Sequence, residues 1–276
     1  MLFIYTIPLY LLFLSVLLLC LAVNLGGTWL VRHKNWMIHP DDNGTAAFAH
    51  AFVAVLYAVA LGLMVVGVQS SYSEVEMVVM KEAYIAGDLY IDAEGLSGSK
   101  GSDIQALTKK YIDAVIQKEW PAIAAGNTIE KETQNVVNEL LHRIITYHPE
   151  SDRDLVIYAE VLSEANDLLD QRRERLHLGG DGVGKVTWSV VIMGALITIG
   201  IAWFYNTRSA RAHYGLVAGM SLMFSLMIFQ ILAMDHPLWG EFSVNSTPFK
   251  EVKREITTWE QKYVVNRENI KDMHKK

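Results

Sequence analysis

The sequence predicts an all-α polytopic membrane protein, with four transmembrane helices and a helical extramembrane bundle between the second and the third. The first observation is composition: of 276 residues, 51% are hydrophobic, and they gather in four long blocks. The second is length, because each block reaches the roughly 20 residues with which a helix crosses a ~30 Å hydrocarbon layer. The third is periodicity: between the blocks, apolar residues recur at helical spacing and no strand-like alternation is sustained.

The four apolar blocks are expected to be helices because backbone polar groups in lipid must bond within their own segment. The first block lacks the basic leader of a signal peptide, and we interpret it as a retained helix. Its Cys20 is the only cysteine, and packing is the simplest role for it. The predicted membrane helices cover about 4–30, 46–68, 186–205 and 214–234, which divides the chain into 1–68, an extramembrane domain 69–185, 186–234 and a charged helical tail 235–276.

The extramembrane domain is predicted to be a small helical bundle that continues out of the second helix. Ser73–Glu76 and Ser102–Gln105 have the capping-box form of a helix start, and Ser151–Asp154 is a looser start signal. Breaks are expected at 94–102, 124–127 and 148–150. The charged run Gln171–Arg175 is most simply a solvated face. Apolar stripes are expected at Ile104, Leu107, Tyr111 and Val115, at Val136, Val137, Leu140, Leu141 and Ile144, and at Leu155, Tyr158, Leu162 and Ala165.

The orientation is predicted from the two short loops. One contains Arg32 and Lys34 beside the membrane, and the other contains Arg208 and Arg211. The positive-inside rule places both loops in the cytoplasm. We therefore expect a bacterial inner (cytoplasmic) membrane protein, with residues 69–185 and both termini extracytoplasmic.

Two patterns of possible chemistry are weak. Gly179–Lys185 fits the skeleton of a phosphate-binding loop, but no strand precedes it and Val186 stands where Ser or Thr belongs, so a linker is the better interpretation. Histidines near the predicted cytoplasmic face leave a copper, zinc or haem site as an alternative, yet no two have ligand spacing on one helix face. No set of catalytic residues is present, and we expect no enzyme, no cofactor and no metal. The histidines are His33, His39, His50 and His213.

Polar residues inside the predicted helices are candidates for a pore or for interhelical contacts. His50 is an ionisable group within a span, and such groups usually face the bundle interior or a water-filled path. Asn24 and Gln230 are candidate hydrogen-bond partners between helices. The second helix is rich in alanine and glycine, which permits close helix packing or a narrow pore surface.

The stretch AMDHPLWGEFSV, residues 233–244, is predicted to be the exit from the fourth helix. Pro237 disfavours helix at the preceding residue, and Trp239 suits the membrane interface. Asp235 lies at a helix C-terminus, where the macrodipole disfavours a carboxylate, so we expect it to have a cationic partner. The candidates for that structural contact are Arg172, Arg173 and Arg175.

Several stretches together resemble the bestrophin-like membrane protein family over nearly the whole chain. They are AFVAVLYAVALGLMVVGVQSSYSEVE (51–76), EAYIAGDLYIDA (82–93), YIDAVIQKEWPAIAAG (111–126), RRERL (172–176) and the Asp235, Pro237, Gly240 pattern. The resemblance implies kinship with bestrophins, which are oligomeric anion channels whose second helix lines the pore. It implies that Phe48, Phe52, Tyr57 and His50 are the first pore residues to test. In bestrophins the extramembrane bulk is cytosolic, which is opposite to the orientation that the charges predict.

Two functions are therefore expected as alternatives. The first is an oligomeric ion channel, most plausibly for anions. The second is a non-catalytic structural or accessory subunit of a homo-oligomer or of a larger membrane complex. The expected partners are the lipid bilayer, further copies of the chain and other membrane proteins, with no nucleic acid.

Overall fold

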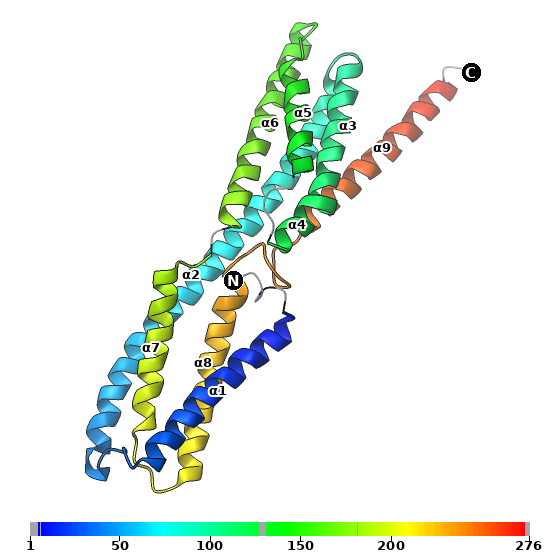
Figure 1. The fold of residues 1–276 in the computed structure, drawn as a ribbon. Helices are drawn as coiled ribbons and strands as arrows, with labels where there is room; N and C mark the ends of the chain where they lie inside the picture. The colour runs from blue at the N-terminus through cyan, green and yellow to red at the C-terminus, as the bar shows by residue number, and fades with distance from the viewer. Residues whose placement is uncertain (1–4, 6, 127–130, 181, 274–276) are drawn as a thin grey trace. The chain divides into compact units, whose positions relative to one another are not determined.

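The computed structural model describes residues 5, 7–126, 131–180 and 182–273, and the backbone alone over 263–273. All regular structure in this part of the chain is helical, which confirms the predicted fold class. The chain divides into two compact units (Figure 1). Unit 1 comprises 1–72 and 181–242, and unit 2 comprises 73–180 and 243–276.

Unit 1 holds the four helices that are long and apolar enough to cross a membrane. Each corresponds to one predicted block, and hydrophobic length is the reason that they could be found in the sequence. The helices of this unit are α1 (Leu9–His33), the short η2 (Pro40–Asp42), the first part of α2 (Asn43–Asp92), α7 (Lys185–Trp203) and α8 (Ala210–Met234).

The packing of unit 1 pairs α1 with α8 and α2 with α7. Two glycines let α7 lie close to α2 and α1 lie close to α7. A Cβ on Gly194 of α7 would overlap the ring of Tyr57, and one on Gly27 of α1 would overlap the ring of Trp203. The apolar core between α2 and its neighbours consists of Tyr57, Leu61, Val68, Val191, Ala195, Ile199 and Ile231.

Unit 2 is a helical bundle, as predicted for the region between the second and third membrane helices. Its helices end at the predicted breaks, where glycine, proline and polar residues interrupt the periodicity. They are the remainder of α2, η3 (Ala93–Gly95), α3 (Ser99–Ala114), a π turn (Val115–Glu119), α4 (Trp120–Ala124), α5 (Lys131–Ile145), α6 (Asp152–Leu178) and α9 (Thr247–Met273).

Two of the predicted helix starts need correction. Ser73 lies inside α2, which runs without a break from Asn43 to Asp92, so its capping box caps nothing. A capping residue works only where the preceding backbone is non-helical. Near Ser102 the helix α3 begins earlier, at Ser99, directly after Gly98 with a φ of 74°. The looser signal is confirmed: Ser151 precedes α6, and its hydroxyl accepts a hydrogen bond from the Asp154 N–H at 3.2 Å.

The apolar stripes of α3 and α5 are confirmed, because their residues are buried apart from the half-buried Leu141. The stripe predicted for α6 is correct at the buried Ala165, and Tyr158 and Leu162 are half-buried, but it is wrong at Leu155. Leu155 is 54% exposed, whereas the neighbouring Asp154 is 2% exposed. The buried face of α6 repeats at spacings of three, four and seven, and it consists of Asp154, Val161, Ala165, Leu168, Arg172 and Arg175.

The C-terminal helix α9 belongs to unit 2, where it contacts α3 and the π turn. Phe249, Val252 and Ile256 are its buried residues, and Lys253 pairs with Asp113 of α3 at 2.5 Å. A charged helix was predicted for this tail, and its first turns are anchored by an apolar face.

Candidate functional site

A cluster of buried charges lies in the interior of unit 2. Glu82 comes from α2, Glu119 from the π turn, and Arg172 and Arg175 from α6. Both glutamates and Arg175 have 0% relative exposure, and Arg172 has 4%. We call these four residues, with Tyr111 of α3, the buried ionic cluster. Isolated charges are very costly to remove from water, so the arrangement of their partners decides whether the bundle is stable.

Arg175 is the centre of the cluster because it bridges both carboxylates. Its Nε donates to Glu82 Oε2 at 2.5 Å and its Nη2 to Glu82 Oε1 at 3.0 Å, a bidentate pair. The same Nη2 donates to Glu119 Oε1 at 2.6 Å. The Trp120 ring lies 5.1 Å from the guanidinium carbon. A planar guanidinium suits this task because its fixed fork of N–H groups matches carboxylate geometry.

Arg172 completes the pairing from the preceding turn of α6. Its Nη2 donates to Glu119 Oε2 at 2.7 Å, and its Nη1 donates to Gln134 Oε1 of α5 at 3.0 Å. Glu119 therefore has one arginine on each carboxylate oxygen. Two glutamates and two arginines leave the cluster without net charge.

Tyr111 links α3 to the cluster, since its hydroxyl donates a short hydrogen bond to Glu82 Oε1. Burial, followed by the Glu82 charge, holds the pKa of Tyr111 well above its usual value. For Glu119, burial alone would raise the pKa, but Arg175 and Arg172 outweigh it and the pKa is lowered. The lowered pKa of Glu119 favours an ionised carboxyl beside the two arginines, and the raised pKa of Tyr111 keeps the tyrosine neutral.

Local sequence explains how Glu119 reaches the interior. Pro121 has no N–H for the helix ladder, and its ring would clash with the carbonyl of Gln117 in a regular α-helix. The chain widens into the π turn Val115–Glu119 at this point. Such turns re-aim side chains within a helix. The neighbouring Trp120 donates from Nε1 to the Val244 carbonyl at 3.2 Å, which attaches the residues before α9 to the bundle.

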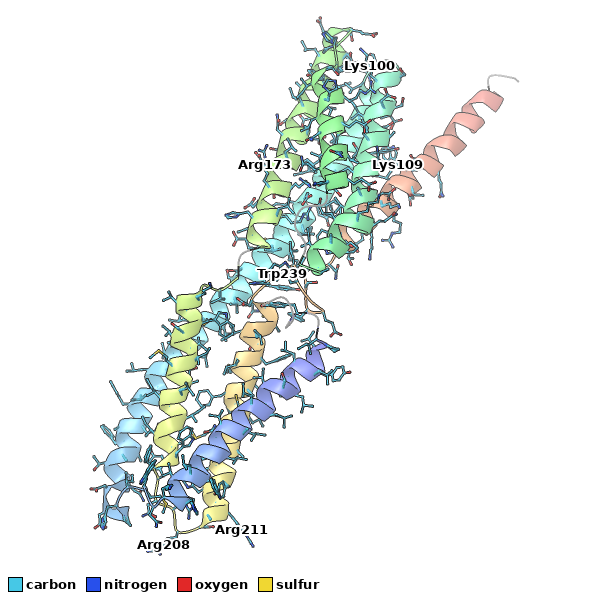
Figure 2. The ribbon with its side chains drawn as sticks, in the orientation of Figure 1. Lys100, Lys109, Arg173, Arg208, Arg211 and Trp239 are labelled. Carbon is cyan, nitrogen blue, oxygen red and sulfur yellow. The ribbon has the colours of Figure 1, made fainter. Side chains whose placement is uncertain are left out.

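The structure overturns the expectation that Gln171–Arg175 is a solvated face. Arg172 and Arg175 are buried, while Arg173 between them points outward from α6 and pairs with Asp170 at 3.0 Å (Figure 2). Sequence reasoning missed Glu82 and Glu119 as well. For the two arginines the sequence does contain a signal. Arg175 follows Val161 and Leu168 in steps of seven residues, and Arg172 follows Ala165 by seven, so both fall on the buried stripe of α6.

An acidic group between α2 and α6 is the part of the described chain that has metal-ligand geometry. Asp92, Glu160 and Glu164 each place a ligand atom within 4.8 Å of the others. Burial, and then the charges of Asp92, Asp88, Glu160 and Asp167, raise the pKa of Glu164 to about 8. Carboxylates of this kind suit hard cations such as Ca²⁺. A bound cation would relieve the repulsion between these neighbouring carboxylates, and protonation of Glu164 would relieve it as well.

Among the described residues, the histidines of the alternative metal site have separate partners. His213 is 2% exposed. Its Nε2 lies 3.0 Å from the Ala202 carbonyl oxygen, and its Nδ1 lies 3.2 Å from Arg32 Nη1. His33 stacks on Trp29. A carbonyl oxygen can only accept a hydrogen bond and a guanidinium can only donate one, so His213 carries its proton on Nε2 and accepts from Arg32 through Nδ1.

Asp235 has partners, as predicted, but the structure gives it neutral donors. Its carboxylate accepts from the Val183 N–H at 2.5 Å, from Trp188 Nε1 at 3.2 Å and from the Tyr5 hydroxyl at 3.2 Å. These donors join α8 to the start of α7 and to the segment before α1. Among the expected cationic partners, Arg172 and Arg175 are paired instead with the glutamates of the buried ionic cluster.

The membrane candidates fall on two opposite sides of α2. His50 contacts the Tyr205 hydroxyl at 2.9 Å, and Tyr57 donates to the Val191 carbonyl at 2.9 Å, so both hold α2 to the α7 side. Phe48 and Phe52 are 81% and 65% exposed. At 100° per residue they lie well away from the face of Tyr57. The four predicted pore residues therefore do not form one group.

The other two polar candidates lie on α1 and α8. Asn24 is 1% exposed, donates to Ser221 Oγ at 2.7 Å and accepts from Trp203 Nε1 at 3.0 Å. Asn24 thus makes hydrogen bonds between helices, because the two partners lie on α8 and α7. Gln230 is half-buried on α8.

These features define a helical integral membrane protein whose extramembrane helices enclose a charge-balanced ionic cluster. A family model for the Bestrophin-like domain matches residues 18–249, and the chain belongs to that family. The resemblance found in the sequence is thereby confirmed. Searches of curated proteins and of solved structures gave no significant match.

The family match gives the buried ionic cluster its context. Glu82 opens EAYIAGDLYIDA, Tyr111 and Glu119 lie in YIDAVIQKEWPAIAAG, and both arginines lie in RRERL. Three of the stretches that carry the resemblance thus meet at one point of unit 2. Sequence could show each stretch separately, whereas only the fold shows that they contact one another.

Proposed function

We propose that the protein is an oligomeric membrane channel that conducts anions. The observation that carries the proposal is the exposure of α2 in unit 1. Apart from its contact with α7, this helix leaves an apolar face uncovered. A small-residue ridge on that face consists of Gly44, Ala47, Ala51, Ala58 and Gly62, all exposed.

This ridge supports assembly because small residues let helix backbones approach closely in a membrane. A Cβ on Gly44 or Gly62 would meet nothing within 4 Å, so the space beside them is open. At 100° per residue the ridge lies on one face, with Phe48 and Phe52 along its border. Copies of the chain arranged about an axis would bring these faces together, and family membership supports an ion path there.

The test is ion flux through the purified protein in liposomes. We expect chloride or iodide flux above that of empty liposomes, together with a homogeneous oligomer in mild detergent. Absence of flux across pH and calcium concentration, with the oligomer intact, would contradict the channel. A second protein with Gly62→Leu tests the ridge itself, because the leucine fills the ridge while the α7 contact of α2 is unchanged.

The alternative is a structural or accessory subunit, which the same uncovered face of α2 also supports. In that case another membrane protein covers the ridge. Mild-detergent purification from native membranes then yields a stoichiometric second protein, and Gly62→Leu releases it. A homogeneous oligomer of this chain alone argues against the accessory role.

The proposed location is a bacterial inner membrane, with unit 2 and both termini extracytoplasmic. Arg208 and Arg211 support this orientation, since Arg208 lies in the short connection between α7 and α8 and Arg211 in the first turn of α8, at the end of unit 1 away from Trp239 (Figure 2). Single cysteines introduced at Arg208 and at Lys110, in a Cys20→Ser background, should react with an impermeant maleimide from the cytoplasmic and the outer side respectively. The reverse pattern would support the cytosolic placement that bestrophins have.

A further inference from the structure

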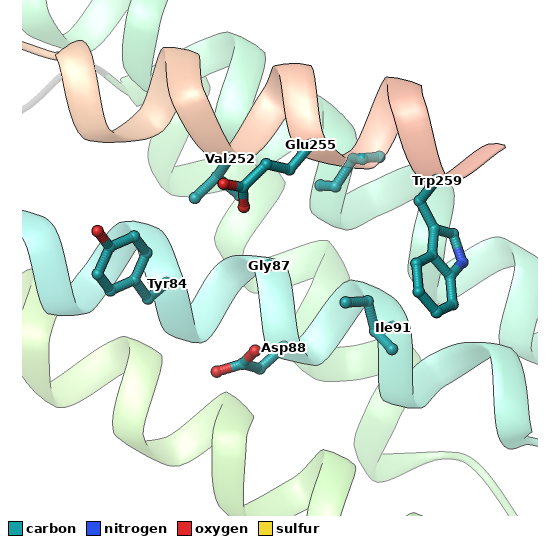
Figure 3. A pocket seen from close by; sticks show the side chains of 8 residues that line it. Tyr84, Gly87, Asp88, Ile91, Val252, Glu255 and Trp259 are labelled. Atoms are coloured by element: carbon teal, nitrogen blue, oxygen red, sulfur yellow. The ribbon is translucent and has the colours of Figure 1, made fainter. Parts of the chain in front are cut away.

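A groove runs along unit 2 between α2 and α9, with a volume of about 390 Å³. Figure 3 shows Tyr84, Asp88 and Ile91 on its α2 side and Glu255 and Trp259 on its α9 side. The volume admits side chains rather than a whole helix. A helix laid along the groove can fill it with one row of side chains, in the manner of helix-in-groove recognition.

The helix α9 contacts α2 at more than one place along the groove. One contact is at Gly87, where a Cβ would lie 3.1 Å from Val252, and another is at Tyr90, whose hydroxyl donates to Glu260 Oε1 at 2.6 Å. Trp259 also donates from Nε1 to Glu94 Oε2 at 3.1 Å, which fixes the indole at the end of the groove. Tyr84 is 48% exposed and Ile91 is 39% exposed, so the groove presents apolar surface to its surroundings.

The charge of the groove is negative. Asp88 and Glu255 line it, and neither carboxylate has an ion-pair partner among the described residues. Asp92 follows Asp88 by about one helical turn on α2. An occupant with complementary charge must therefore carry lysine or arginine beside apolar residues.

The chain has one such segment, its last fifteen residues. Although the whole chain has a net charge of −6, residues 262–276 contain five Lys or Arg and two acids. The apolar residues of this segment are Tyr263, Val264, Val265, Ile270 and Met273, interspersed with the basic ones.

The segment cannot reach the groove of its own chain. The groove is lined by 252–259 of α9, and α9 continues as one helix to Met273. At 1.5 Å per residue, Met273 lies about 21 Å beyond Trp259 along the helix. The segment would have to reverse direction inside a helix to meet its own groove, so the occupant comes from another copy.

We propose that the basic C-terminal segment of one copy docks in the acidic, apolar groove between α2 and α9 of a second copy. The contact joins two different surfaces, and such a head-to-tail contact repeated from copy to copy builds a ring when the rotation between copies closes. The inference concerns unit 2 and goes beyond the channel proposal, because docking is measured without any flux.

The test uses two differently tagged copies, each with Cys20→Ser, expressed together in membranes. One carries Tyr84→Cys in the groove and the other carries Lys271→Cys in the segment. A short bismaleimide is expected to give a covalent dimer with both tags. The control replaces Tyr84→Cys by Lys110→Cys, an exposed position outside the groove, and is expected to give only background.

Charge reversal makes the test specific. Asp88→Lys with Glu255→Lys on the groove copy, or Arg267→Glu with Lys275→Glu on the segment copy, should each reduce the dimer to background. Combining both pairs should restore it. High salt should weaken the dimer, because exposed charges are screened.

Three results would overturn the proposal. The first is no dimer above the Lys110→Cys control. The second is a dimer that both charge reversals leave unchanged, which would mean that another part of the groove surface is in contact. The third is crosslinking within one chain when both cysteines are on a single copy diluted by cysteine-free copies, which would mean that the segment docks on its own groove.

Discussion

At the scale of single residues, the buried ionic cluster depends on Arg175 having two carboxylates within reach. A buried ion pair stabilises a protein little more than well-packed apolar residues in the same place would, because the cost of removing the charges from water offsets their attraction. Removing one partner is different, because the remaining charges stay buried without compensation. Arg175 is the residue whose loss leaves two of them, Glu82 and Glu119.

Arg175→Leu is therefore expected to destabilise unit 2 by roughly 3–5 kcal/mol, or to prevent its folding. The matched control is Arg173→Leu, two residues away on the same helix, where the side chain is 72% exposed. An exposed ion pair contributes little, so the control should change stability by only a few tenths of a kcal/mol. Thermal unfolding of the detergent-solubilised protein measures both. Equal effects of the two substitutions would mean that the cluster does not carry this stability.

Glu164 predicts a pH dependence of stability. Its pKa in the folded protein is about 8, against an ordinary value of 4.5. The folded state therefore holds a proton that the unfolded state has lost, and stability falls as the pH rises from about 4.5 through 8. Glu164→Gln keeps a neutral side chain at every pH and should flatten this fall.

Thermal unfolding of both proteins from pH 5 to pH 9 checks this, and the difference between the two curves isolates Glu164 from other titrating groups. The variant should be the more stable protein at the alkaline end. Curves that stay parallel would show that the carboxyl is ionised in the folded state throughout. Added Ca²⁺ should stabilise the wild type more than Glu164→Gln at the alkaline end if the three carboxylates hold a cation.

At the scale of elements, α2 decides most of the arrangement because its two sides have different partners. The side with Tyr57, Leu61 and Val68 packs on α7. The ridge side is uncovered. A sequence profile of this helix shows small and apolar residues all round, so the division cannot be recognised before the partner helix is placed.

The α2–α7 contact predicts a difference between two glycines of α7. Gly194→Ala places a Cβ against the ring of Tyr57, whereas Gly200→Ala meets nothing within 4 Å. Overpacking a tight contact costs roughly 1–3 kcal/mol, so only Gly194→Ala should lower the unfolding temperature. The double variant Gly194→Ala, Tyr57→Leu should recover part of the loss. If the two glycine variants behave alike, α2 and α7 are not in the close contact described.

At the scale of the whole molecule, the two units use different physical means of stability. Unit 1 has long apolar helices with a few satisfied polar contacts, such as Asn24 with Ser221. Unit 2 combines an apolar core with charges brought together from α2, the π turn and α6. Function, under the proposed channel, belongs to the assembled oligomer, where the uncovered side of α2 meets its copies.

The proposed channel predicts that Phe48 and Phe52 affect conduction and that Tyr57 does not. Phe48→Ala with Phe52→Ala should change anion flux per oligomer several-fold, because both rings border the uncovered ridge. Tyr57→Phe removes only the hydrogen bond to Val191 and should leave flux unchanged while lowering stability by about 1 kcal/mol. Liposome flux normalised to oligomer content measures this. A flux that responds to Tyr57→Phe alone would place the ion path on the α7 side of α2.

The amino-acid sequence by itself determined the membrane class, the four apolar helices, the helical nature of the intervening domain and the family. These properties depend on hydrophobic length and on local periodicity, which neighbouring residues contain. Only the tertiary structure decided that Arg172 and Arg175 are buried, that Tyr57 and Phe48 face opposite ways, and that Asp235 accepts from neutral donors. Glu82 and Glu119 lie 93 and 56 residues from Arg175 along the chain. Whether a charge is solvated or paired depends on such distant partners, and only the folded chain brings them together.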